Sequence, residues 1–75
     1  MVIKVLGTGC EKCHKLEENT KKAVEELGLD ATIEKVENIV DIMKYGVMKT
    51  PALVVDEKVK LMGRVPTVEE IKKYL

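Results

Sequence analysis

The sequence has few aromatic residues and no net charge, and both shortages narrow the range of functions. It contains no tryptophan and no phenylalanine, so Tyr45 and Tyr74 are its only aromatic side chains. Stacking platforms for nucleic-acid bases are therefore missing. The 13 basic and 13 acidic side chains cancel. Because a nucleic-acid binder needs a basic face and nothing indicates one, we expect no nucleic-acid partner.

A long hydrophobic run is also missing. The apolar stretch VIKVL, residues 2–6, is interrupted by Lys4 and stops at Gly7. It is too short for a signal-peptide core or for a membrane span. We therefore expect a cytosolic (cytoplasmic) protein with no membrane partner. Thiols stay reduced in that compartment, so a close pair of cysteines is more often catalytic or metal-binding than structural.

The length and the mixture of residues indicate one small domain. The chain has 75 residues, of which 45% are hydrophobic and 35% charged, as is usual for a globular domain. We find no internal repeat, low-complexity tract or linker. We therefore expect a single domain over residues 1–75, with a thin core, and a monomer.

The first half of the chain indicates a strand, a long helix and a second strand. Residues 2–6 are rich in β-branched side chains and end at Gly7, and residues 31–36 form a similar, half-polar stretch. Between them, apolar side chains recur at steps of three and four residues, which predicts an amphipathic helix with one buried face. These side chains are Cys13, Leu16, Ala23, Val24 and Leu27. Gly28 is placed to end this helix.

A short helix and a hairpin are predicted next. Asn38 is a favourable cap for the helix, and Gly46 would end it. The apolar side chains of this helix are Ile39, Ile42 and Met43. Residues 52–55 and 58–62 indicate strands with only two residues between them, which predicts an antiparallel hairpin.

The chain closes with a third helix, and the order of elements indicates the fold class. Thr67 and Glu70 form a Ser/Thr-x-x-Glu capping box directly after Pro66. The helix that follows would bury Val68, Ile71 and Leu75. The order β-α-β-α-β-β-α predicts two parallel strands with a right-handed crossover and a hairpin that completes the sheet. We expect an α/β fold with a four-stranded mixed sheet flanked by helices.

The stretch TGCEKCH, residues 8–14, holds both cysteines of the chain. Cys10 falls in the loop after the first strand, at the predicted N-terminus of the first helix, where free amides and the helix dipole stabilise a thiolate. A lowered pKa would make Cys10 the attacking nucleophile. Cys13, one turn into the helix and more buried, would resolve the mixed disulfide. Lys12 adds a positive charge that favours the thiolate, and Glu11 opposes it.

A strand, then G-T-G-C-x-x-C opening a helix, then Thr50-Pro51 before a hairpin, resembles the thioredoxin superfamily. The chain is most similar to the small thioredoxin/glutaredoxin-like redox-active disulfide proteins of archaea and bacteria, and residues 63–71 (GRVPTVEEI) look like the ending of that group. The resemblance covers essentially the whole chain. It implies a thioredoxin-like fold in which a cis peptide bond precedes Pro51 and its loop faces the active-site disulfide.

The resemblance also implies a function and a set of partners. The chain would be a protein disulfide reductase that uses Cys10 and Cys13, with no cofactor and no metal. Its partners would be protein disulfide substrates and an upstream reductase similar to thioredoxin reductase. Backbone groups of Thr50 and Pro51 would pair with the substrate strand. Gly9 and Gly63 are further candidates for the substrate site, where a glycine permits a close approach.

The sequence departs from the family pattern at three places. Lys4 stands where thioredoxins carry a buried acid, so the proton released during resolution would go to water, Glu11, His14 or another group. Gly9 stands where thioredoxins carry tryptophan. Residues 63–66, Gly-Arg-Val-Pro, replace the Gly-Gly-and-acid segment through which glutaredoxins hold glutathione. We therefore do not expect efficient use of glutathione.

Other functions of the cysteine pair stay open. A copper or mercury carrier would also place Cys-x-x-Cys after the first strand, and thiolates suit soft metals. Such carriers have the order β-α-β-β-α-β, however, and end in a strand. A thioredoxin-like binding module whose cysteines no longer turn over is the second alternative. Haem attachment at Cys-x-x-Cys-His and a closed zinc site fit less well, because the former occurs in all-helical exported proteins and the latter needs a fourth ligand.

The single histidine and the methionines could be considered for a functional role, but a structural role explains them more simply. His14 is the only histidine and lies on a polar stretch of the predicted helix, so we expect a solvated side chain. Three methionines form a soft set, and we expect them to fill gaps in the small core. These are Met43, Met48 and Met62.

Overall fold

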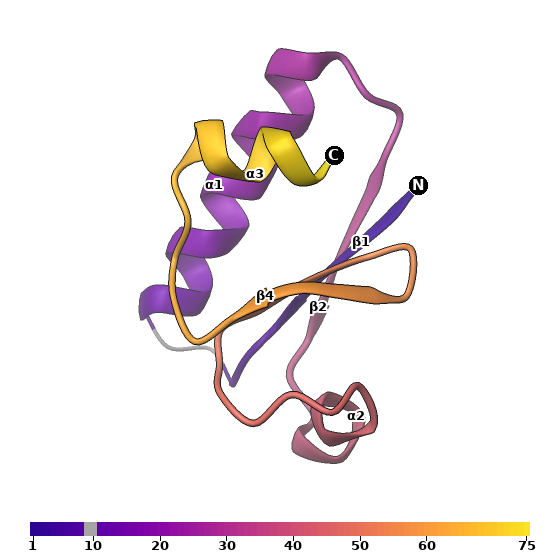
Figure 1. Cartoon of the computed structure of the whole chain (residues 1–75), viewed down its shortest axis with the longest axis vertical. Helices are drawn as coiled ribbons and strands as arrows, with labels where there is room; N and C mark the ends of the chain where they lie inside the picture. Colours follow the sequence, from indigo (N-terminus) through magenta and orange to yellow (C-terminus); the bar gives the residue numbers. More distant parts are fainter. Residues whose placement is uncertain (9–10) are drawn as a thin grey trace.

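The computed structural model describes residues 1–8 and 11–75 and contains the predicted order of elements, β-α-β-α-β-β-α (Figure 1). The strands are β1 (Val2–Leu6), β2 (Thr32–Val36), β3 (Ala52–Val55) and β4 (Lys58–Met62). The helices are α1 (Glu11–Leu27), α2 (Ile39–Lys44) and α3 (Val68–Tyr74). The second strand begins at Thr32, one residue later than expected.

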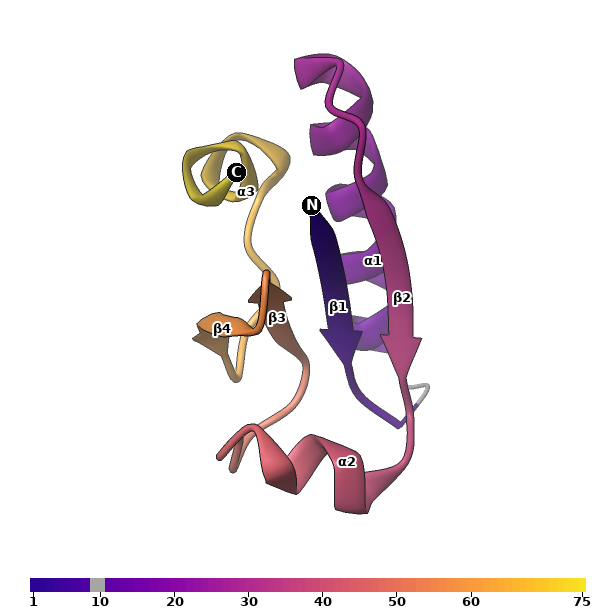
Figure 2. The same cartoon turned by 90° about the vertical axis from the view of Figure 1, so that its right-hand side faces the viewer.

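The four strands form one mixed sheet in the order β2-β1-β3-β4. β1 and β2 run parallel, whereas β3 is antiparallel to both β1 and β4, as the arrows in Figure 2 show. The α/β fold class expected from the sequence is thus confirmed. One irregularity interrupts the hairpin: Leu53 pairs with Leu61 but Val54 pairs with Val59. Lys60 therefore lies in a β-bulge.

The two-residue turn of the hairpin has the backbone that such a turn requires. Asp56 and Glu57 both have positive φ, 48° and 68°, which matches the type I′ geometry favoured in two-residue hairpins. The turn is also tied to the first strand. The Asp56 N–H donates to the Val2 carbonyl at 2.8 Å, and the Val2 N–H donates to Asp56 Oδ1 at 2.9 Å.

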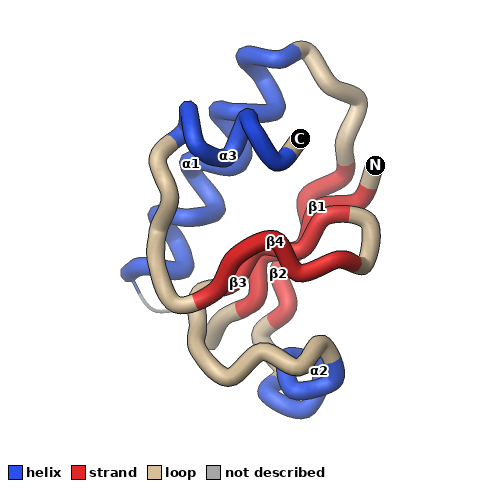
Figure 3. The backbone as a smooth tube through the Cα atoms, in the orientation of Figure 1, coloured by secondary structure: helices blue, strands red, loops and turns tan. Residues whose placement is uncertain are grey.

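Side chains alternate between the two faces of the sheet and build two cores. On one face, Ile3, Val5, Leu53 and Val55 pack with buried residues of α1 and α3. On the other face is a smaller core under α2, formed by Leu6, Ile42, Val47, Ala52 and Val54. Figure 3 shows α1 and α3 lying together, with α2 apart from them. The larger core therefore lies under two helices and the smaller under one.

Helix α1 has the expected buried face, with one error at its end and two polar residues that we did not expect. Leu27 was predicted to be buried, but it is 43% exposed because the helix ends beyond the edge of the core. Asn19 and Thr20 are buried instead. Asn19 Nδ2 donates to the Pro66 carbonyl at 2.9 Å, and Thr20 Oγ1 donates to the Leu16 carbonyl at 2.7 Å. These bonds satisfy the buried polar groups.

Gly28 ends helix α1 as predicted. Its φ is +64°, and the Leu29 N–H donates back to the Val24 carbonyl at 3.1 Å. This 6→1 bond after a left-handed glycine is the Schellman arrangement at a helix C-terminus.

Helix α2 is capped as predicted, but it exposes more apolar surface than expected. The Asn38 side chain accepts from the Val40 N–H at 2.8 Å, and Gly46 has a φ of +74°. Of the three expected apolar side chains only Ile42 is buried, because a six-residue helix presents little more than one turn to the core. Ile39 is 62% exposed and Met43 is 67% exposed.

The expectation that three methionines fill the core is therefore wrong. Besides Met43, Met48 is 92% exposed and Met62 is 42% exposed. The small core is filled by aliphatic residues of the strands, which leaves these methionines at the surface.

Helix α3 begins with half of the expected capping box. Thr67 Oγ1 accepts from the Glu70 N–H at 3.2 Å. The Glu70 carboxylate, however, pairs with Arg64 rather than completing the box, because the guanidinium offers a charged partner. Ile71 is fully buried, as expected, and Val68 and Leu75 are partly buried against the same core.

No helix in the described part of the chain combines the length and the apolar character needed to cross a membrane.

Candidate functional site

Cys13 is the third residue of α1 and is buried, with 6% of its surface exposed. Its Sγ atom points at the backbone of Gly7, directly after β1. A Cβ atom placed on Gly7 would overlap Sγ and would lie 3.1 Å from the Cβ of Cys13. Only glycine therefore fits at position 7 with Cys13 in this place. Gly9 and Cys10 lie outside the described residues, so the expectations for them stay predictions.

The Thr50–Pro51 loop also approaches Gly7. The peptide bond between Thr50 and Pro51 is cis, as the family resemblance implied, and Pro51 is fully buried. The Cα atom of Pro51 lies 4.0 Å from the position that a Cβ on Gly7 would take. Gly7, Cys13 and Pro51 thus lie close together at the carboxyl end of β1.

Gly63 forms a backbone hydrogen bond to this loop. Its N–H donates to the Pro51 carbonyl at 2.9 Å, and its φ of +81° is a conformation that favours glycine. The Pro51 carbonyl is therefore occupied, and proline has no N–H. Within residues 1–8 and 11–75 the peptide groups of Thr50 have no hydrogen-bond partner. Of the expected pairing groups, those of Thr50 remain available.

A groove of about 360 Å³ runs from this loop towards α2. Thr8 and Thr50 line it, and the other lining residues are apolar. Among them are the exposed side chains Ile39, Met43 and Met48. The apolar surface that α2 leaves uncovered is thus continuous with the loop of Pro51.

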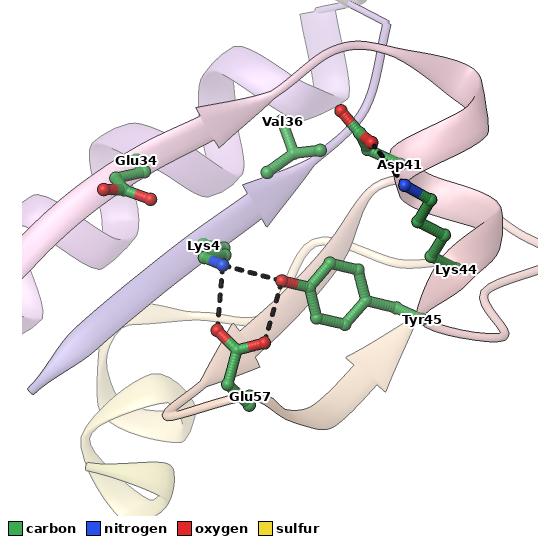
Figure 4. A pocket seen from close by; sticks show the side chains of 7 residues that line it. All are labelled: Lys4, Glu34, Val36, Asp41, Lys44, Tyr45 and Glu57. Carbon is green, nitrogen blue, oxygen red and sulfur yellow. Dashed lines mark hydrogen bonds and ion pairs between the residues drawn. The ribbon is translucent and has the colours of Figure 1, made fainter.

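Lys4 lies on the α2 face of the sheet, in a polar cluster with Tyr45 and Glu57 (Figure 4). Lys4 Nζ donates to Tyr45 Oη at 2.7 Å and to Glu57 Oε1 at 2.8 Å, and Tyr45 Oη donates to Glu57 Oε2 at 3.1 Å. The bonds to Glu57 and Tyr45 raise the pKa of Lys4 above its ordinary value. The bonds from Lys4 and Tyr45 lower the pKa of Glu57.

Lys4 lies on the face of the sheet opposite to helix α1, which carries Cys13. Strand β1 directs Val5 to the α1 face and Lys4 to the other face. A solvent-open cavity of about 420 Å³ adjoins the cluster, with Glu34, Asp41 and Lys44 among its lining residues. Lys4 therefore acts as a link between β1, the end of α2 and the hairpin turn.

The charged residues near the cysteines are exposed. Glu11, Lys12 and His14 all lie at the surface of the first turn of α1. The expectation that His14 is solvated is confirmed. Neither Glu11 nor Lys12 forms an ion pair with any residue of the described ranges. Their proposed influence on Cys10 stays a prediction.

A second group of side chains near Cys13 was missed from the sequence. The Gly7 N–H donates to the Val36 carbonyl at 3.0 Å, which fixes the end of β2 beside Cys13. Lys35 and Glu37, on either side of Val36, line a small cavity with Cys13. The parallel pairing of β1 with β2 brings Lys35 and Glu37 close to Cys13. The register of that pairing cannot be predicted from the sequence of either strand alone.

In the part of the chain that the structure describes, no group of three or more His, Cys, Asp and Glu side chains is arranged to hold a metal ion.

A helix-borne cysteine that faces a cis-proline loop across the end of a central strand, on a β2-β1-β3-β4 sheet, defines a thioredoxin-like protein. Comparison with known proteins agrees with this geometry. The thioredoxin domain family matches residues 1–75, and the chain belongs to that family. It is thus related to redox proteins.

Two similar proteins are both named thioredoxin. The thioredoxin of Methanothermobacter thermautotrophicus is 48% identical over 75 residues, covering 100% of this chain and 97% of that protein. The thioredoxin of Methanocaldococcus jannaschii is 48% identical over 75 residues, covering 100% of this chain and 86% of that protein. The resemblance deduced from the cysteine and proline motifs is confirmed.

Proposed function

We propose that this chain is a thiol–disulfide oxidoreductase that reduces protein disulfides, with residues 1–75 acting as one domain. The observation that carries the proposal is the position of Cys13, buried against Gly7 and opposite the cis-Pro51 loop. A second thiol three residues earlier, at Cys10, completes a Cys-x-x-Cys pair at the start of α1. Membership of the thioredoxin family supports dithiol chemistry at this pair.

The reaction proceeds in two exchanges that balance electrons and protons. The Cys10 thiolate attacks one sulfur of the target disulfide, and the other target sulfur leaves as a thiolate and takes up a proton. Cys13 then loses its proton and attacks Cys10 Sγ, which releases the second target thiol. The target gains two electrons and two protons, and Cys10 and Cys13 become a disulfide. An upstream reductase returns this disulfide to the dithiol.

The surface around the pair supports an extended protein segment as the substrate. The peptide groups of Thr50 have no partner in the described ranges, so they can pair with the backbone of the target. The adjoining apolar groove, with the exposed Met43 and Met48, can receive its side chains. Flexible methionines suit targets of differing shape. We place this function in the cytoplasm, where thiols are kept reduced.

Variants of the two cysteines test the proposal. We expect Cys10→Ser to abolish the reduction of a protein disulfide such as that of insulin. We expect Cys13→Ser to accumulate covalent mixed disulfides with its targets, visible on a non-reducing gel and lost on addition of dithiothreitol. If Cys13→Ser traps nothing while Cys10→Ser stays active, the assignment of the two roles is wrong.

The same experiment separates the enzyme from its alternatives. A binding module whose cysteines do not turn over would leave insulin unreduced by the wild-type protein as well. A copper or mercury carrier has the order β-α-β-β-α-β, whereas this chain has the order β-α-β-α-β-β-α. The observed order of elements therefore favours the redox reading.

A further inference from the structure

The resolving step poses a problem that the surroundings of Cys13 help to solve. A thiol must lose its proton before it can attack a disulfide, because the thiolate is the nucleophile. Cys13 is only 6% exposed, and burial opposes ionisation of a thiol. Bulk water therefore has little access to this proton. A defined acceptor near Cys13 would make the second exchange faster.

The structure contains a small cavity beside Cys13. It has a volume of about 10 Å³, which is the space of one water molecule. Gly7, against which the Cys13 sulfur packs, is part of its wall, and so is Cys13 itself. The polar residues in the wall are His14, Lys35 and Glu37. A water molecule here has the polar partners that a buried water needs.

Of these residues, Lys35 is already committed to another partner. Its Nζ lies 3.2 Å from Oε2 of Glu17, which is one helical turn beyond Cys13 and is also paired with Lys21 at 3.2 Å. Partial burial opposes ionisation of Glu17, but Lys21 and Lys35 outweigh it and hold the pKa of Glu17 below its ordinary value. Glu17 and Lys35 thus remain an ion pair at neutral pH and do not exchange protons readily.

Of the described residues that line this cavity, His14 and Glu37 remain as groups that can accept a proton. Both are exposed on their outer side, so either can pass a proton on to solvent. Glu37 directly follows the last residue of β2 and lines the cavity together with Lys35. His14 is the helical neighbour of Cys13 and points away from it by about a quarter turn, because successive residues are about 100° apart.

We propose that the proton of Cys13 leaves through this cavity, by way of one water molecule, to the carboxylate of Glu37. The inference rests on the proposed function and adds a residue to it. In the resolving step the Cys13 thiol gives its proton to the water as the water gives one to Glu37. The Cys13 sulfur forms the bond to Cys10 Sγ, and the target thiolate leaves. Glu37 then releases its proton to solvent.

Because Glu37 is charged, replacing it with glutamine distinguishes proton acceptance from a simple effect of its charge. A carboxylate near a thiol disfavours the thiolate, so Glu37→Gln would speed resolution if Glu37 acted through its charge alone. If Glu37 accepts the proton, the same substitution slows resolution. General base catalysis contributes roughly 10²–10⁴-fold in enzymes. We therefore expect Glu37→Gln to slow the second exchange by about tenfold or more at neutral pH.

The experiment uses the reduced wild-type protein and limiting amounts of the disulfide of 5-thio-2-nitrobenzoate in a stopped-flow instrument. Attack by Cys10 releases one coloured thiolate, and resolution by Cys13 releases the second. The first phase tests the proposed function, since Cys10→Ser must remove it. The second phase tests Glu37. The matched control is Glu34→Gln, which removes a carboxylate of β2 that lines the polar cavity beside Lys4 and not the cavity beside Cys13.

The pH dependence gives a second readout. Between about pH 5 and pH 8, the rate of the second phase in the wild type should depend less on pH than the thiolate fraction of Cys13 does, because Glu37 takes the proton during the attack. In Glu37→Gln the rate should rise about tenfold for each pH unit in that range, because it follows the thiolate fraction alone. An unchanged or faster second phase in Glu37→Gln overturns the proposal. A slow second phase in His14→Gln with a normal one in Glu37→Gln overturns it too, in favour of the imidazole.

Discussion

The two faces of the sheet are built differently. The face under α1 and α3 carries the larger core, and Leu16, Leu53 and Ile71 within it are fully buried. The face under α2 carries a smaller core, with a charged cluster around Lys4 beside it. Two cavities of several hundred Å³ open on that side, whereas the cavity beside Cys13 has room for one water molecule.

This difference suggests a division of work between the faces. Because hydrophobic burial is the main favourable term in folding, the face under α1 and α3 should supply most of the stability. A single short helix cannot cover the other face, so apolar and polar groups remain there for recognition. The proposed redox site includes Cys13, which lies beside Gly7 at the carboxyl end of β1. The following changes test this comparison.

The largest effect is expected from a cavity in the larger core. Leu16→Ala should lower the free energy of unfolding by about 2–5 kcal/mol, because it removes a fully buried side chain between α1 and the sheet. The matched variant on the other face is Ile42→Ala, which should cost less because its helix is exposed on most sides. Urea unfolding at pH 7 measures both. A greater loss for Ile42→Ala would contradict the division.

A smaller effect on stability, with a larger one on the site, is expected at Gly7. Gly7→Ala would force a Cβ atom into Cys13 Sγ, and overpacking of this kind costs about 1–3 kcal/mol. It should also change the rate at which iodoacetamide alkylates Cys13, measured in the Cys10→Ser background. Gly46→Ala is the control, because its positive φ causes strain while nothing lies within 4 Å. It should lower stability and leave the alkylation rate unchanged.

The smallest effect is expected from the charged cluster. Glu57→Gln removes the carboxylate that Lys4 and Tyr45 hold. The pKa of Glu57 is lowered in the folded protein. The contribution of its carboxylate to the free energy of unfolding is therefore fully present above the ordinary carboxyl pKa of about 4.3. It is lost as the pH falls through the lowered folded value. The wild type should therefore unfold at slightly higher urea than Glu57→Gln at pH 7.

That small difference should close in acid. Below about pH 4 the wild type progressively loses the contribution of Glu57, and the two proteins should converge. Glu34→Gln, in the same cavity but without an ion pair in the described ranges, should show no such pH-dependent gap. A gap that persists at acid pH would mean that Glu57 stabilises the fold by packing and not by charge.

Much of the fold could be predicted because local signals determine it. β-Branched runs, helical spacing and the two-residue turn gave the order of elements, and Asn38, Gly28 and Gly46 marked helix ends. The sequence did not show which apolar side chains of each helix would be buried against the sheet. Leu27 and Met43 have the apolar character of core residues, yet Leu27 lies at the end of α1 and Met43 lies in a helix of six residues, and both are exposed.

The site could be predicted only where a motif carries it. Cys13 followed from the Cys-x-x-Cys spacing at the start of the first helix, and the cis bond at Pro51 followed from the family resemblance. The partners of Lys4 did not, because Tyr45 and Glu57 are 41 and 53 residues away in the chain and meet it only in the folded sheet. The same is true of Glu37, whose place beside Cys13 depends on the pairing of β2 with β1.

The bulge at Lys60 has a consequence for concentrated solutions of the protein. β4 is an outer strand, and an outer strand offers unpaired peptide groups to the strands of other molecules. A bulge twists such a strand away from a flat partner, and lysines on it repel an identical strand. β4 carries both devices, with lysines at positions 58 and 60. We expect them to discourage edge-to-edge aggregation of the sheet.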